Sequence, residues 1–296
     1  MRGPIVVGGV GGSGTRVVAQ LLLDLDVDLG NDLNVELDDR WFNLLFYRPT
    51  WLPAALGDGV RSIDPGLDLM RKRSLGDHRM TARERSFVVC AWRDAVATGH
   101  FGGRHRATRR RRASTVWTVR RLTRFMRSAP VQQSNRRGWG WKEPISHLVA
   151  RPVVTRFPDA RYIHVIRHGL DMAFSGNRRQ VTRFGPILGL DAPRSRPDPP
   201  DILRYWIRAN RRVLDIVRSA APARSHVVVF DDLCRTPEQE IGRLLDFLEI
   251  PVTRSRFSAL CAVPEVPESL GRYRSQDLSI FEPSDIDEVS RLGFSV

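Results

Sequence analysis

The hydrophobic residues near the N-terminus follow two different patterns on either side of a glycine-rich stretch. Residues 5–7 (Ile-Val-Val) form an uninterrupted apolar run, which is typical of a buried strand. After the glycines, apolar residues recur at helical spacing, at Val17, Val18, Leu21, Leu22 and Leu25. The order strand, glycine loop, helix is the opening unit of an α/β fold with a parallel sheet.

The same alternation of elements returns after about residue 139. Residues 161–166 and 227–230 are apolar runs that predict two further strands, and residues 202–219 have a helical pattern. A further helix is expected from Pro237, with Thr236 as its cap and Gln239 completing a capping box. We therefore predict an α/β fold of the P-loop-NTPase type, with a central parallel sheet flanked by helices.

Two segments depart from this regular pattern. Residues 31–135 are rich in tryptophan and loops and predict a largely helical insertion above the sheet, whereas residues 251–296 predict an irregular tail. Because no internal repeat or linker separates these segments, residues 1–296 are expected to form a single domain.

The charge of the chain is strongly positive and is carried almost entirely by arginine. The formal net charge is +14, and Lys72 and Lys142 are the only lysines among 47 basic residues. Such a balance favours anionic partners, although a coding bias towards arginine explains it equally well. A basic run at residues 104–112 is consistent with either a solvated face or a nucleic-acid contact, but no nucleic-acid recognition motif accompanies it.

The N-terminus and the cysteines restrict the cellular setting. Residues 1–4 lead directly into the first apolar run, which leaves no room for a signal peptide, and no apolar run approaches the roughly 20 residues that span a bilayer. The three cysteines and seven histidines show no spacing typical of a metal site. We expect a cytoplasmic protein without a bound metal.

The glycine loop is the first candidate for chemistry. Its backbone N–H groups and the N-terminus of the following helix would form an anion cradle, and the residues concerned are Gly11, Gly12, Ser13, Gly14, Thr15 and Arg16. An NTP-binding loop has a lysine where Thr15-Arg16 stands, so the sequence argues against an ordinary ATPase or kinase. A tight structural turn or a dinucleotide-type loop is the alternative interpretation.

Two later segments supply further basic groups. Arg167 follows the strand at 161–166, and Ser175 and Arg179 lie on the helix predicted after it, so the three could bind a second phosphate. Lys142 precedes Glu143 and Pro144, and its rarity in this chain suggests a specific role. Exposed loop positions are the alternative for each of these residues.

Taken together, four segments resemble the sulfotransferases that use 3′-phosphoadenosine-5′-phosphosulfate (PAPS). Residues 11–16 resemble the family's 5′-phosphosulfate loop, and residues 167–175 resemble its 3′-phosphate segment. Residues 142–144 are similar to the Lys-Asp-Pro of the tyrosylprotein sulfotransferase branch, and residues 230–248 are similar to a Tyr-Glu-x-Leu…Pro…Phe-Leu segment. The resemblance covers residues 1–30 and about 139–250.

The resemblance implies transfer of a sulfuryl group from PAPS to a hydroxyl or amine, with adenosine 3′,5′-bisphosphate as the product and no metal. The acceptor is left open among carbohydrates, glycolipids, small metabolites and peptide tyrosines. Lys142 and Arg16 are the candidates for neutralising charge on the leaving phosphate, and Asp32, then Glu36, for the general base. Gly12 stands where the family usually has a basic residue, and His168 where it usually has an aspartate.

Three other functions stay open at this stage. A P-loop kinase for nucleotides or small molecules would depend on ATP and Mg²⁺, and a basic nucleic-acid-binding protein would use residues 104–112 without catalysis. A degenerate family member would bind PAPS without turnover, which the glycine at position 12 makes conceivable.

Overall fold

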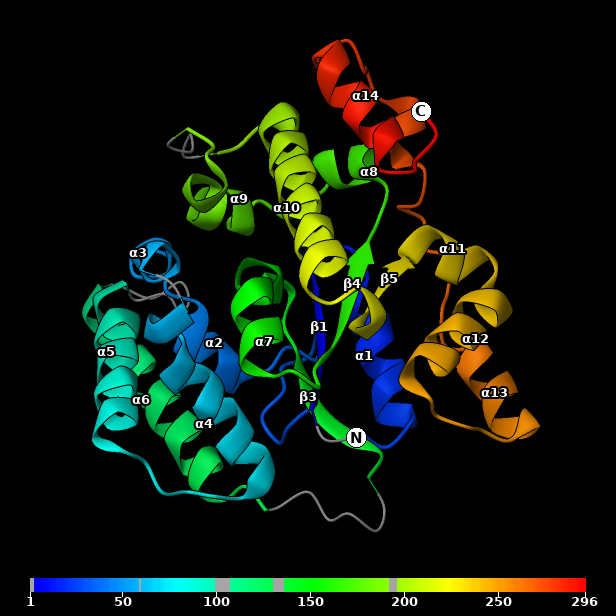
Figure 1. The fold of residues 1–296 in the computed structure, drawn as a ribbon. Helices are drawn as coiled ribbons and strands as arrows, with labels where there is room; N and C mark the ends of the chain where they lie inside the picture. Colours follow the sequence, from blue (N-terminus) through cyan, green and yellow to red (C-terminus); the bar gives the residue numbers. More distant parts are fainter. Residues whose placement is uncertain (1–2, 59, 99–106, 130–135, 192–195) are drawn as a thin grey trace.

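The computed structural model describes residues 3–58, 60–98, 107–129, 136–191 and 196–296. Five parallel strands form its sheet in the order β2-β3-β1-β4-β5 (Figure 1). Their bounds are β1 Pro4–Gly9, β2 Val27–Asp28, β3 Gly138–Lys142, β4 Arg161–Ile166 and β5 Ser225–Val229. The predicted α/β fold with a central parallel sheet flanked by helices is confirmed.

Helices cover both faces of the sheet, and every residue of the central strand β1 is therefore buried. Val6 belongs to the core shared with α7 (Ala150–Arg156) and α10 (Pro199–Ala220), whereas Ile5 and Val7 belong to the core on the other face. That second core is closed by α1 (Thr15–Asp24), α11 (Phe230–Arg235) and α12 (Pro237–Leu248). Figure 1 shows α7 and α10 on one side of the strands and α1 and α12 on the other.

The helix caps differ from those predicted. Thr236 does precede α12, but its hydroxyl donates to the carbonyl of Asp232 at 3.0 Å and caps nothing, so no capping box forms with Gln239. The capping box lies instead at α10, where the Asp198 carboxylate accepts from the Asp201 backbone N–H and the Asp201 carboxylate from that of Asp198. The long central helix therefore has the better-defined start.

Residues 31–135 contribute a group of helices beside the sheet. Their bounds are α2 Arg40–Phe46, α3 Leu52–Gly57, α4 Asp64–Leu75, α5 Ala82–Thr98 and α6 Ala107–Met126. In Figure 1, α4, α5 and α6 lie together on the β3 side of the molecule. Residues 104–106 of the basic run lie outside the described residues, and residues 107–112 form the first turns of α6. Within the described ranges, no helix is long and apolar enough to cross a membrane.

The tail from residue 251 is not irregular, as we had expected, but contains two α-helices. Helix α13 (Arg254–Cys261) packs against α12, and α14 (Pro283–Arg291) packs against α10. Between them a short 3-10 turn, Arg272–Ser275, contacts α8 (Gly169–Ala173). The sequence did not predict these helices because each is too short to show a clear helical pattern of apolar residues. In α13 the only buried residue is Leu260.

Candidate active site

The candidate residues gather at the carboxyl ends of the parallel strands, where α/β sheets usually bind ligands. The glycine loop follows β1, Lys142 ends β3, Arg167 follows β4 and Phe230 follows β5. These four strands are neighbours in the sheet, so residues far apart in the sequence are brought to one edge.

The glycine loop has the backbone conformation of an anion cradle. Gly12 and Gly14 have φ values of 99° and 89°, a region that favours glycine, and α1 begins directly after them at Thr15. A Cβ atom on Gly14 would lie 2.0 Å from Cδ2 of Phe230, so this glycine also lets the aromatic ring pack against the loop. The first residues of α1, Thr15 and Arg16, line a cavity, so the helix N-terminus is placed where an anion could bind.

Two adjoining cavities open beside this loop. The first has a volume of about 500 Å³ and is lined by the glycine loop, Lys142, Arg167 and Phe230, among others. The second has a volume of about 480 Å³ and lies towards the insertion, against Asn43, Tyr47 and Trp117. The two cavities share part of their walls, because five residues line both: Gly11, Glu36, Asp38, Pro144 and Asn177.

The structure brings together most of the residues that the sequence singled out. The first cavity is lined by Gly11, Gly12, Gly14, Thr15, Arg16, Glu36, Lys142 and Arg167. Arg179, at the start of α9 (Arg179–Phe184), lines the second cavity. Ser13, Asp32 and Ser175 line neither of them.

Lys142 is the most buried cation of the site, with a side-chain exposure of 2%. Its Nζ donates to the backbone carbonyl of Glu36 at 2.8 Å and forms an ion pair with Asp38 at 2.5 Å. An ammonium group has three N–H donors, so these two contacts leave one donor for a substrate oxygen. The buried charge is compensated by Asp38 and at the same time available at the cavity.

Glu143, the next residue, is buried and lines the second cavity. Its carboxylate accepts from the backbone N–H of Ile145 and so begins the 3-10 turn Pro144–Val149. Burial, reinforced by the nearby Asp38, raises the pKa of Glu143 well above its usual range, although the charge of Lys142 opposes this. The group is therefore more easily protonated than an exposed glutamate.

Arg167 is held by the tail. Its Nη2 donates to the carbonyl and the hydroxyl of Ser269, at 2.7 and 2.9 Å, and lies 3.8 Å from Asp171. Asp171 in turn accepts from the backbone N–H groups of Gly271 and Tyr273. Burial lowers the pKa of Arg167, against the opposing charge of Asp171.

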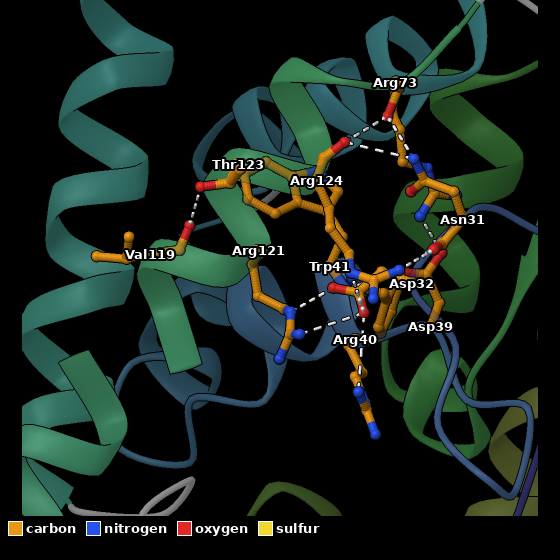
Figure 2. Close-up of polar contacts among 12 residues, drawn as sticks. Asn31, Asp32, Asp39, Arg40, Trp41, Arg73, Val119, Arg121, Thr123 and Arg124 are labelled. Carbon is orange, nitrogen blue, oxygen red and sulfur yellow. Dashed lines mark hydrogen bonds and ion pairs between the residues drawn. The ribbon is translucent and has the colours of Figure 1, made fainter. Parts of the chain in front are cut away.

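Asp32 is not at either cavity but in a cluster of arginines, which Figure 2 shows. Its side chain is 3% exposed and forms ion pairs with Arg121, Arg124 and Arg40. Arg124 also donates to the carbonyl of Asn31 at 2.7 Å. This cluster ties the loop that leads to Glu36 and Asp38 to helix α6, which is a structural role.

The Arg167 side chain is suited to bind an anion. Its Nε is buried and has no hydrogen-bond partner within the described ranges, and the residue lines the first cavity. A buried donor without a partner is costly, so an acceptor on a bound ligand is expected to satisfy it. Ser13 Oγ also has no partner within those ranges, but Ser13 lines neither cavity. Among the described residues, no group of three or more His, Cys, Asp or Glu side chains is arranged to hold a metal ion.

Sequence reasoning missed four residues of the first cavity that matter to its chemistry: Asp38, Asn177, Phe230 and Pro267. Asp38 lies only two residues from Glu36, and its partnership with Lys142 spans 104 residues, which no local pattern reveals. Phe230 was predicted only as the end of a strand. In the structure the Arg167 guanidinium lies 5.4 Å from its ring centroid, so the ring makes a cation–π contact with the arginine.

Comparison with known proteins gives one match that covers most of the chain. The model of the Sulfotransferase family matches residues 4–254. No curated protein matches the sequence.

Among solved structures, the chain is similar to the sulfotransferase domain of the olefin synthase from Synechococcus PCC 7002, with 15% identity, a TM-score of 0.46 and coverage of 100% of this chain and 97% of that one. It is also similar to a sulfotransferase from Mycobacterium avium, with 14% identity, a TM-score of 0.47 and coverage of 99% and 77%.

Proposed function

This chain belongs to the sulfotransferase family, and from that premise we propose that it transfers a sulfuryl group from PAPS to a hydroxyl of a polar acceptor. The observation that supports this proposal most is the pair of adjoining cavities, which share five lining residues. One cavity has the anion cradle that a nucleotide needs, and the other is open to a second substrate. A transfer reaction requires such an arrangement of two substrates side by side.

The donor would occupy the first cavity. Its 5′-phosphosulfate is expected at the glycine loop and the N-terminus of α1, and its 3′-phosphate at Arg167, which is fixed by Ser269. In the reaction the acceptor oxygen forms a bond to sulfur while the bond between sulfur and the bridging phosphate oxygen breaks. Adenosine 3′,5′-bisphosphate leaves, and the acceptor proton passes to a base.

We assign charge neutralisation to Lys142 and the base to Glu36. The third N–H of Lys142 can donate to the bridging oxygen as negative charge develops there. Glu36 lines both cavities, and among the described residues its carboxylate is paired only with the exposed Arg16, at 3.1 Å. Asp38 positions Lys142 and is less suited to accept a proton, because protonation would break that buried ion pair.

The lining of the second cavity suggests the kind of acceptor. Carboxylates, amides and a phenol surround it, including Asp38, Asn34, Asn43 and Tyr47. Such groups hydrogen-bond to hydroxyls. A polyhydroxylated acceptor such as a carbohydrate or the headgroup of a glycolipid therefore fits better than a largely apolar alcohol.

The proposal can be tested by nucleotide binding followed by turnover. We expect adenosine 3′,5′-bisphosphate and PAPS to raise the melting temperature, since a ligand at 100 times its Kd stabilises the folded state by about 2.7 kcal/mol. ATP with Mg²⁺ should have little effect, and the opposite result would favour the kinase alternative. Incubation with PAPS and a panel of carbohydrate acceptors should then yield products heavier by one SO₃ group.

A further inference from the structure

The place where the two cavities meet is poor in hydrogen-bond donors. The five residues that line both cavities are Gly11, Glu36, Asp38, Pro144 and Asn177. Two are carboxylic acids that act as acceptors when ionised, and glycine and proline have no polar side chain. Asn177 is the only one of the five with a side-chain N–H donor.

The backbone N–H groups at this junction are already in use. The Gly11 N–H donates to Oε1 of Gln180 at 3.0 Å, in a buried hydrogen bond that joins the glycine loop to helix α9. The N–H groups of the other three non-proline residues also donate within the chain, and the loop between Val10 and Thr15 has no basic side chain. Because the remaining N–H of Lys142 is assigned to the bridging oxygen, other oxygens held at the junction need a different donor.

The amide of Asn177 lies directly against the glycine loop. A Cβ atom built on Gly11 would be 2.8 Å from Asn177 Nδ2, and one built on Gly12 would be 3.8 Å from the same atom. Among the described residues, the Nδ2 group of Asn177 makes no hydrogen bond, and the residue is exposed to the cavities. The donor is therefore close to the loop and available.

We propose that the side-chain amide of Asn177 binds the sulfuryl group of PAPS and acts as the donor to its oxygens during transfer. This inference rests on the proposed function, since the group being transferred must lie where donor and acceptor cavities meet. A neutral amide would stabilise charge on the sulfuryl oxygens through one N–H bond, in the position where the loop itself offers no side chain. Gln180 is a positioning residue: its hydrogen bond to the Gly11 N–H holds the glycine loop next to the amide of Asn177.

The experiment compares two nucleotides that differ by the sulfuryl group alone. Isothermal titration of the whole chain gives the Kd for PAPS and for adenosine 3′,5′-bisphosphate, and the ratio of the two reports contact with that group without any acceptor. In Asn177→Ala the Kd for PAPS should rise about tenfold, the usual effect of losing a hydrogen bond to a charged group, while the Kd for the bisphosphate stays within about twofold.

Two further variants sharpen the comparison. Asn177→Asp keeps the size of the side chain but places a carboxylate beside the sulfuryl oxygens. It should therefore raise the Kd for PAPS more than Asn177→Ala does. Asn43→Ala is the matched control, because this asparagine lines the second cavity but not the first, and it should leave the ratio of the two Kd values unchanged.

The outcomes separate this inference from the proposed function. If the parent protein binds neither nucleotide, both fail. If the parent binds both and Asn177→Ala changes neither affinity, or changes both equally, the role of Asn177 alone is refuted. Retained bisphosphate binding in each variant shows that the site is folded.

Discussion

Arg167 donates to the hydroxyl of Ser269 at 2.9 Å, a hydrogen bond that joins the end of β4 to the tail across 102 residues. The arginine is thereby fixed at the rim of the first cavity before any ligand binds. Such pre-organisation lowers the conformational entropy that the arginine side chain would lose when a 3′-phosphate binds.

We expect Arg167→Ala to weaken the binding free energy of adenosine 3′,5′-bisphosphate by roughly 1.5–3 kcal/mol, the range for a hydrogen bond to a charged group. Adenosine 5′-phosphosulfate, which lacks the 3′-phosphate, should be almost unaffected. Ser269→Ala should have a smaller effect in the same direction, because the arginine keeps its charge and its hydrogen bond to the backbone carbonyl and loses only the bond to the hydroxyl. Competitive titration of the two nucleotides measures this, and equal losses for both would make Arg167 a purely structural residue.

Lys142 should matter more for turnover than for nucleotide affinity. Its charge is compensated by Asp38 in the resting protein, and we have assigned its remaining N–H to the bridging oxygen of the donor. Removing a positioned charge that acts on the transition state costs roughly 10²–10³ in rate, so Lys142→Ala should lose about that much in single-turnover experiments.

Lys142→Arg is the matched variant. It keeps the charge, but the forked guanidinium cannot reproduce the contacts of a compact ammonium group with Glu36 and Asp38. We expect a loss of rate here too, with bisphosphate affinity within a few-fold of the parent in both variants. Full activity in Lys142→Ala would leave Arg16 as the remaining candidate.

Asp32→Asn should destabilise the fold instead of removing a base. It would leave Arg121, itself 3% exposed, buried without its carboxylate partner, and breaking a buried ion pair typically costs about 3–5 kcal/mol. Urea unfolding measures the loss. Glu36→Gln is the control, because the ion pair of Glu36 with Arg16 is 56% and 60% exposed and such pairs contribute less than about 1 kcal/mol. A stable but inactive Asp32→Asn would restore Asp32 as the candidate base.

Stability should fall as the pH drops below 6.5. His164 is fully buried on β4 and bonds Asn210 of α10 at 2.8 Å, and burial lowers the pKa of His164 from 6.5 to about 4. Between these values the unfolded chain binds the proton and the folded chain does not, so stability is present above pH 6.5 and is lost towards pH 4. Each such histidine contributes a slope of up to about 1.4 kcal/mol per pH unit.

His147 is a second contributor, because burial also lowers the pKa of this residue well below its usual value. Urea midpoints measured from pH 7 to pH 4 in the parent and in His164→Gln test the prediction. The variant should show a shallower dependence on pH. An identical dependence in both proteins would mean that His164 does not titrate in the way its burial implies.

Local patterns were sufficient for strands β1, β4 and β5, but not for β2 and β3, which the sequence analysis did not predict. The apolar runs at residues 5–7 and 161–166 each form part of a buried strand of the sheet, since periodicity and burial are tied to backbone geometry. Lys142 was found through its rarity and its neighbours, and it does reach the cavity.

What the sequence could not show was long-range placement. Asp32 and Asp38 are two aspartates of one segment, and only the positions of Arg121 and Lys142 decide that the first is buried away from the cavities and the second faces them. Asn177 and Ser175 likewise differ by two positions, yet only the former lines the junction. Such choices depend on tertiary contacts that no single segment encodes.

The attachment of Arg167 to Ser269 has a consequence for how the protein is made. Synthesis runs from the N-terminus, so the glycine loop, Lys142 and Arg167 all leave the ribosome while residues 267–275 are still to be translated. A growing chain can close its sheet by residue 229, but the arginine then lacks its support. On the proposed function, we therefore expect nucleotide affinity to be acquired late, after the sheet has formed and once the tail has packed Tyr273, Phe281 and Val289 into the core.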